Sequence, residues 1–324
     1  MLYFNSLQSV DGKYIVFGTV YPAVYLIDSL NGNITYKKFL KGENNSQTNL
    51  ICKSILLEDN IVYFTCYGDY IHILDTRTLE EKATLHVYKK CGFFSFVGIL
   101  FNMAYLINVE AEELILIDLC TWDIKTIKYS TDGKYDKVPH TMINDGKIYV
   151  AFDNSNVIMT YNPAANDFKI MEIDACKRIA AISFIDRKFV IVPYGEPFIL
   201  INGIKRNLNL ELRDRVVAFN VGDEFYFGAA GSNTLNVLDS QSKINKIVDS
   251  INIYWGESIN SGNEGYYYGE NQISFIRDKN IKIKLGEQPN SPIFEELIKD
   301  QCILQEDKEV INLENLINSI NIVY

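Results

Sequence analysis

The chain has 324 residues, of which 48% are hydrophobic and 13% aromatic, and its formal net charge is −10. Its 21 Tyr and 18 Phe supply enough apolar surface for a large core, which excludes a disordered chain. A sequence pI near 4.9 argues against a protein that binds nucleic acid by neutralising phosphates. By length alone, the chain forms one large domain or two ordinary ones.

The N-terminal segment, residues 1–11, has no basic start, no long apolar stretch and no small-residue cleavage site, so it does not resemble a secretory signal. No apolar run reaches the about 18 residues that a membrane span needs. The six cysteines form no Cys-x-x-Cys pair, which is typical of free thiols in a reducing compartment. We therefore expect a cytoplasmic protein, and the excess of Lys over Arg indicates an AT-rich bacterial genome.

Residues 1–285 show almost no helical periodicity. Short apolar runs bounded by Asp, Asn and Gly dominate instead, and such runs predict many short β-strands. One unit recurs along the chain: a turn, an apolar strand, a polar loop, a second apolar strand that ends in Asp or Asn, and a further turn and strand. In chain order, the two apolar strands of each copy are predicted at 14–17 and 24–28, 61–64 and 71–75, 103–106 and 114–118, 148–150 and 157–162, 189–192 and 198–202, 225–227 and 235–239, and 266–268 and 273–278.

The spacing of these copies matches a propeller. The marker residues that end the second strand are Asp28, Asp75, Asp118, Asn162, Asn202, Asp239 and Asp278. They lie about 42 residues apart on average, and one four-stranded propeller blade has about 40–45 residues. Apolar segments such as 94–101, 179–185 and 216–221 precede the opening turns and are predicted to be innermost strands. Seven copies predict an all-β, seven-bladed β-propeller over residues 1–285.

Two further expectations concern the turns and the first copy. Asp and Asn side chains accept hydrogen bonds from backbone NH groups two residues on, so we interpret the marker residues as turn formers and not as catalytic carboxylates. Residues 1–10 should supply the inner strand of the first blade, and the alternative is that they complete the last blade as an outer strand. The repeat resembles the WD40-, YVTN- and quinoprotein-type propellers in period and strand layout, a resemblance that implies the fold and does not fix a function.

The pattern changes after residue 285. Ser291 followed by Pro292 is a typical helix start, and a second helix is predicted from about Leu313. The apolar faces of the two predicted helices consist of Phe294, Leu297, Ile298, Leu313, Leu316, Ile317 and Ile320. Residues 286–324 hold eight acidic and two basic residues, a net charge of −6, so residues 1–285 contribute only −4. This short helical appendage, the tail, either caps the propeller or docks on a partner protein.

The loops that join successive blades should open on one face of the propeller. They carry basic and aromatic residues, together with a histidine that we expect at the mouth of the central channel. These candidate binding residues are Lys89, Lys90, Lys134, Tyr135, Lys137, His140, Lys177, Arg178, Arg213, Arg215, Tyr254 and Trp255. A basic and aromatic face on an acidic body suits an acidic peptide, a sugar or a phosphorylated ligand, and the alternative interpretation is ordinary solvated loop charge.

Signals of catalysis are few. His72 lies in a predicted strand and is expected to pack, and His86 ends a strand, which leaves His140 as the histidine expected in a mouth loop. The Cys and His residues are too scattered for a zinc site, and neither a Gly-x-Ser-x-Gly elbow nor a P-loop motif occurs. We expect no catalytic residues, no metal, no cofactor, and neither nucleic acid nor membrane as partner.

Two functions remain after these exclusions. The first is a non-catalytic scaffold that binds protein partners through the loop face, the tail or both. The alternative is a ligand- or carbohydrate-binding enzyme or accessory protein with a site in the central channel.

Overall fold

The computed structural model describes residues 4–11, 13–18, 23–28, 34–39, 51–65, 70–86, 94–131, 138, 140–208, 216–259, 264–269, 272–276 and 282–284. The chain divides into two compact units: one is Leu2–Ile283, and the other joins Met1 with Lys284–Tyr324. Lys284 is the one described residue of the second unit, so the fold of the described residues is essentially that of the first. The helices predicted within residues 286–324 lie outside the described residues.

The described residues form seven four-stranded sheets. In chain order, the first contains β1 (Phe4–Val10), β2 (Lys13–Gly18), β3 (Ala23–Asp28) and β4 (Ile34–Phe39). The second contains β5 (Ile51–Leu57), β6 (Asn60–Thr65), β7 (Tyr70–Asp75) and β8 (Glu81–His86). The third contains β9 (Phe94–Leu100), β10 (Met103–Asn108), β11 (Glu113–Asp118) and β12 (Ile124–Lys128). The fourth contains β13 (His140–Asn144), β14 (Lys147–Ala151), β15 (Val157–Asn162) and β16 (Asp167–Glu172).

The remaining three sheets repeat the same plan. The fifth contains β17 (Ile179–Ile185), β18 (Lys188–Pro193), β19 (Phe198–Ile201) and β20 (Ile204–Asn207). The sixth contains β21 (Val216–Val221), β22 (Glu224–Ala229), β23 (Ser232–Leu238) and β24 (Ile244–Ile253). The seventh contains β25 (Trp255–Ile259), β26 (Glu264–Gly269), β27 (Gln272–Phe275) and β28 (Lys282–Lys284).

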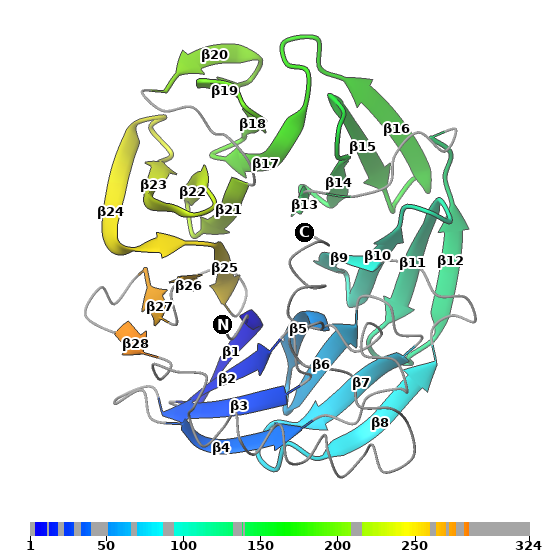
Figure 1. Cartoon of the computed structure of the whole chain (residues 1–324). Helices are drawn as coiled ribbons and strands as arrows, with labels where there is room; N and C mark the ends of the chain where they lie inside the picture. The colour runs from blue at the N-terminus through cyan, green and yellow to red at the C-terminus, as the bar shows by residue number, and fades with distance from the viewer. Residues whose placement is uncertain are drawn as a thin grey trace, which may run out of the picture. The chain divides into compact units, whose positions relative to one another are not determined.

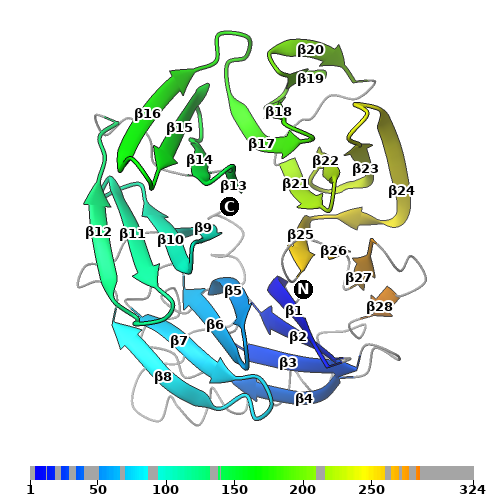
Figure 2. The same cartoon turned by 180° about the vertical axis from the view of Figure 1, so that it is seen from behind.

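The sheets are arranged around a common axis. Within each sheet the strands lie in sequence order, and consecutive strands such as β9, β10, β11 and β12 pair antiparallel. The first strands of the sheets contact one another in the order β1, β5, β9, β13, β17, β21 and β25, and β25 contacts β1. Figure 1 shows these first strands innermost, and Figure 2 shows the same arrangement from behind. The unit is an all-β propeller, as the repeat predicted.

The core lies between neighbouring sheets, and β11 shows why. Its side chains alternate between the two faces of the strand. Leu114 and Leu116 pack in a cluster shared with the fourth sheet, whereas Ile115 and Ile117 pack in a cluster shared with the second. The third sheet is therefore covered on both faces, which explains the continuous apolar run in its sequence.

Three of the marker residues close the turn that follows them. Asp75 and Asp118 each accept hydrogen bonds from the backbone NH groups two and three residues on, at 2.8–3.0 Å. Asn162 accepts one from the NH group two residues on, at 3.1 Å. The interpretation as turn formers is confirmed for these three. Asn202 differs, because its Oδ1 accepts from the backbone NH of Phe189 on the adjacent strand, at 2.8 Å.

Strand β24 connects the sixth sheet to the seventh. Its first half and, after a register shift, Ile253 pair with β23, and the strand also lies against β26. The hydroxyl of Tyr267 on β26 donates to Asp249 Oδ2 on β24, at 2.5 Å. The backbone carbonyl of Asn252 fills the space that a Cβ on Gly269 would occupy, so a side chain larger than that of glycine does not fit there.

Two predictions about the strands have a clear outcome. The inner strands predicted at 94–101, 179–185 and 216–221 are β9, β17 and β21, correct to within one residue. β1 is the first strand of the first sheet, so the alternative that the N-terminal residues complete the last sheet is wrong. In the part of the chain that the structure describes, no helix is long and apolar enough to cross a membrane.

Candidate functional site

The propeller has two ends, which we name by their connections. The turn face carries the turns between the first and second and between the third and fourth strands of each sheet. Its described segments are 11, 58–59, 76–80, 101–102, 119–123, 145–146, 163–166, 186–187, 202–203, 222–223, 239–243 and 276. The loop face carries the connections between second and third strands and between sheets. Its described segments are 109–112, 129–131, 138, 152–156, 173–178, 194–197, 208, 230–231 and 254.

Polar side chains on the first strands join neighbouring sheets around the axis. Gln8 Nε2 on β1 donates to the backbone oxygen of Ser54 on β5, at 2.9 Å. Thr141 Oγ1 on β13 donates to backbone carbonyls of β9, at 3.4 and 3.5 Å. Ser183 Oγ on β17 donates to Asn220 Oδ1 on β21, at 2.9 Å. These polar groups are already hydrogen-bonded to groups of the neighbouring sheets. They therefore stabilise the ring of sheets and are not available to bind a ligand.

His140 is the first residue of β13, at the loop-face end of that strand, and was predicted in the adjacent loop. Its Nε2 lies 3.3 Å from the carbonyl oxygen of Ala218 on β21, a strand of the sixth sheet. With Nε2–H donating to that carbonyl, Nδ1 is left as a buried acceptor that has no hydrogen-bond partner among the described residues. Burial lowers the pKa of His140 to about 4, against the opposing effect of the Ala218 carbonyl. The imidazole is therefore neutral near pH 7, and one lone pair is unused.

Arg178, which directly precedes β17, was predicted as a charge available to a ligand. Its Nη2 lies 3.3 Å from Asp153 Oδ1, in a loop of the fourth sheet. Its guanidinium carbon lies 4.1 Å from the ring centroid of Tyr194, in a loop of the fifth sheet. The charge of Arg178 is thus engaged across the seam between two sheets, while Lys177 beside it is exposed.

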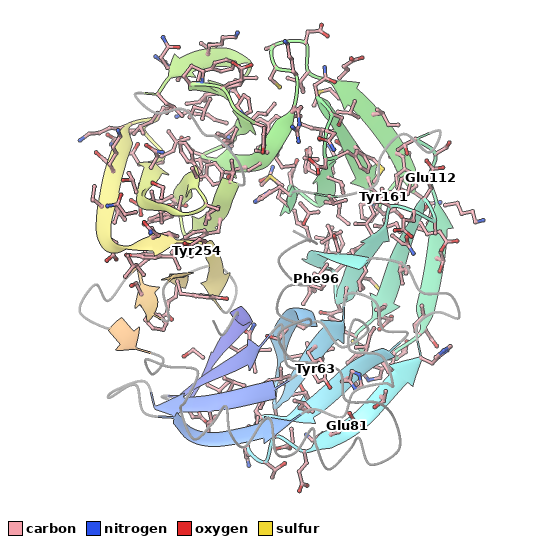
Figure 3. All side chains as sticks on the ribbon, in the orientation of Figure 1. Tyr63, Glu81, Phe96, Glu112, Tyr161 and Tyr254 are labelled. Atoms are coloured by element: carbon pink, nitrogen blue, oxygen red, sulfur yellow. The ribbon has the colours of Figure 1, made fainter. Side chains whose placement is uncertain are left out.

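The described part of the loop face is not basic. Its charged residues are Glu110, Glu112, Asp153, Asp174 and Glu196, with Lys177 and Arg178 as the bases. Glu112, labelled in Figure 3, accepts from the backbone NH and the hydroxyl of Thr131, at 2.6 and 2.5 Å. The predicted basic character therefore depends on loops outside the described residues.

Most other predicted binding residues lie in those loops. Outside the described residues are Lys89, Lys90, Lys134, Tyr135, Lys137, Arg213 and Arg215, and the tail residues Phe294, Leu297, Ile298, Leu313, Leu316, Ile317 and Ile320. Trp255 is the first residue of β25. Tyr254, between β24 and β25, is 39% exposed (Figure 3). The structure places Tyr254 on the loop face and leaves the grouping of the others a prediction.

His72 packs in the second sheet against Tyr63 and Glu81. His72 stacks on Tyr63 with ring centroids 4.6 Å apart, and its Nδ1 lies 3.0 Å from Glu81 Oε2. Burial, and secondarily the nearby Glu81, raises the pKa of Tyr63 (both labelled in Figure 3). The predicted packing of His72 is confirmed. Because Tyr63 and His72 are cross-strand partners, strand register is the signal that finds this cluster.

Reactive and metal-binding groups are scarce in the described residues. Cys120 is exposed and Cys176 buried, and both are free thiols. Burial raises the pKa of Cys176 to about 11, which keeps its thiol protonated and a weak nucleophile near pH 7. The described residues contain no group of three or more His, Cys, Asp or Glu side chains that could hold a metal ion.

No protein-family model matches the sequence, and no curated protein matches it. The structure is similar to that of a streptogramin B lyase, with 11% identity over 83% of this chain and 91% of that one and a TM-score of 0.63. It is also similar to a catalytically inactive virginiamycin B lyase from Staphylococcus aureus with quinupristin, with 14% identity, coverage of 83% and 92%, and a TM-score of 0.63. The WD40 repeats of RRP9 give 10% identity, coverage of 83% and 88%, and a TM-score of 0.59. At such low identities, these likenesses show the propeller fold alone.

Proposed function

We propose that this chain is a seven-bladed β-propeller, with each four-stranded sheet as one blade, that serves as a non-catalytic protein-interaction scaffold. The number of sheets, their repeated strand order and the contact between β1 and β25 support the seven-bladed ring. A propeller of this kind has two wide faces on which partners can bind, and the fold itself does not specify one chemical reaction. The side chains of the innermost strands therefore distinguish a scaffold from an enzyme.

The observation that carries this proposal is the composition of the first strands. Apart from Cys52, their sequences contain three ionisable side chains, Lys53, His140 and Glu257, each on a different strand. General acid–base catalysis needs a titratable group poised near the working pH, usually beside a partner that tunes it. His140 is neutral and already bonded to the Ala218 carbonyl. The innermost wall favours structural packing over catalysis.

The surfaces predicted from sequence remain part of the proposal. Exposed Lys177 and Tyr254 belong to the loop face, which would meet an acidic peptide or a sugar if the remaining basic loops gather there. The acidic tail, with its apolar Leu and Ile faces, would dock on a protein partner. We further propose a cytoplasmic protein without a cofactor, since its six cysteines are spaced as free thiols are in a reducing compartment.

One observation favours the alternative, a ligand- or carbohydrate-binding protein with an axial site. Nδ1 of His140 is a buried acceptor without a partner in the described part of the chain, and a buried polar group in that condition costs free energy. A ligand hydroxyl at this position would satisfy it. The two functions therefore differ in whether His140 matters for binding.

Affinity capture from the native host tests the proposal. The full chain should retain a stoichiometric protein partner, and His140→Gln should retain the same partner, because the scaffold does not use the axial imidazole. A pair of full-length tail variants, Leu297→Asp and Leu316→Asp, tests the tail: loss of the partner assigns docking to it. Retention of no protein, together with a small molecule that binds the wild type and not His140→Gln, would contradict the scaffold.

A further inference from the structure

The turn face carries an aromatic side chain that packing does not explain. Phe101 is 73% exposed, the highest value among the large hydrophobic side chains that the structure describes. It lies in the turn between β9 and β10 with φ +52°, and Asn102 follows with φ +57°. Both central residues of such a turn have positive φ, which bulky side chains rarely adopt. The corresponding turn of the fourth sheet holds Asp145 and Gly146, the residue types such turns favour.

The turn that presents Phe101 is held in place. The backbone oxygen of Asn102 accepts a hydrogen bond from the NH of Leu119 in the adjacent turn, at 2.8 Å. The Asn102 side-chain amide donates to Cys120 Sγ, at 3.8 Å. Cζ of Phe101 lies 3.7 Å from the position that a Cβ on Gly146 would take, so the ring lies at the turn of the next sheet. A fixed aromatic group loses little freedom when a partner binds.

Acidic side chains predominate in the corresponding turns of the other described sheets. In the described turns between first and second strands, the exposed acids are Asp11, Glu58, Asp59, Asp145, Asp186 and Asp223. Arg187 is the one base in those described turns. Because the first strands lie side by side around the axis (Figure 1), their turns lie at one end of the ring. The third sheet presents Phe101 where most others present an acid.

We propose that the turn face, with Phe101 as its apolar anchor, docks a basic segment of a partner protein, in which an apolar side chain is flanked by Lys or Arg. This inference rests on the proposed scaffold function and names its face and partner. The acidic turns attract such a segment and repel acidic peptides and nucleic acid. The exposed ring supplies apolar contact, and its π-face also accepts a cation.

Binding of two synthetic peptides to the full chain tests this inference. Both are Lys/Arg-rich and of equal charge, and one has a central Leu-Phe pair where the other has Ala-Ala. Fluorescence anisotropy should show that the wild type prefers the first peptide, and that Phe101→Asn weakens this binding about tenfold without changing the second. The pair Asp145→Asn and Asp186→Asn should weaken both peptides, because Asn keeps the turn and removes the charge. Added salt should weaken both as well.

Matched controls give the result its specificity. Ile204→Ser removes an exposed apolar side chain from the outer strand β20, and Glu110→Gln removes an acid from the loop face. Both variants should bind the peptides as the wild type does. Equal binding by the wild type and the turn-face variants, or equal losses in the controls, would overturn the assignment of this face. If the captured host partner still binds those variants, the assignment fails while the scaffold function stands.

Discussion

Replacement of His140 by Gln isolates the energetic consequence of burying an imidazole beside the axis. The histidine ring donates to the Ala218 carbonyl, and its buried Nδ1 is unpaired as far as the described residues go. Gln can also donate to that carbonyl, but it does not titrate. The variant should therefore differ from the wild type in how its stability depends on pH.

The size and sign of this effect follow from the two pKa values. An unfolded histidine has a pKa of 6.5, whereas folded His140 has a pKa of about 4. Between these pKa values the unfolded chain binds more protons than the folded chain, so the free energy of unfolding rises with pH. The protein therefore loses stability as the pH falls through 6.5. From about pH 7.5 to about pH 5 the loss amounts to about 2 kcal/mol.

Urea unfolding at several pH values measures this difference directly. The wild type should lose about 2 kcal/mol more stability than His140→Gln between about pH 7.5 and about pH 5. The subtraction cancels the carboxylates and the other two histidines, because both proteins retain them. Parallel stability profiles for the two proteins would refute the buried, neutral imidazole.

Three further experiments test the packing of the ring and the turn face by urea unfolding. Gly269→Ala should destabilise the fold by about 3 kcal/mol, because its Cβ overlaps a backbone carbonyl, whereas Gly203→Ala, in open space with φ +79°, should cost only about 1 kcal/mol; equal costs would contradict the close approach. A double-mutant cycle of Arg178→Ala and Asp153→Asn should give a coupling of about 0.5–1 kcal/mol, and additive effects would show that the pair does not interact. Phe101→Asn should stabilise the chain by about 1 kcal/mol, because Asn tolerates the left-handed turn, and a loss of stability would mean that the ring packs.

The sequence predicts the strands well because they depend on local patterns. Apolar runs buried on both faces and Asx turns such as that of Asp118 are set by residues close in the chain. The inner strands β9, β17 and β21 follow from the same signals. The propeller fold could therefore be predicted from one sequence.

The environments of the candidate site residues could not be predicted in this way. The sequence predicts Arg178 as a charged loop residue available to a ligand, but its side chain contacts Asp153 and Tyr194 in the loops of two different sheets. His140 lies at a strand end and bonds to Ala218, which is 78 positions away. Such contacts depend on the rotation between sheets, which strand periodicity does not encode. Phe101 was missed because it was assigned to the end of the inner strand predicted at 94–101, whereas it lies in the turn after β9 with a positive φ.

On the proposed function, the propeller acts through its surface and not through chemistry at its axis. Hydrogen–deuterium exchange of the full chain, with and without its captured protein partner, tests this most directly. We expect slowed exchange in the turn-face hairpins around Phe101 and Asp145, with the first strands β13, β17 and β21 unchanged. Slowed exchange confined to those first strands around His140, with the turn face unchanged, would contradict it and point to an axial ligand.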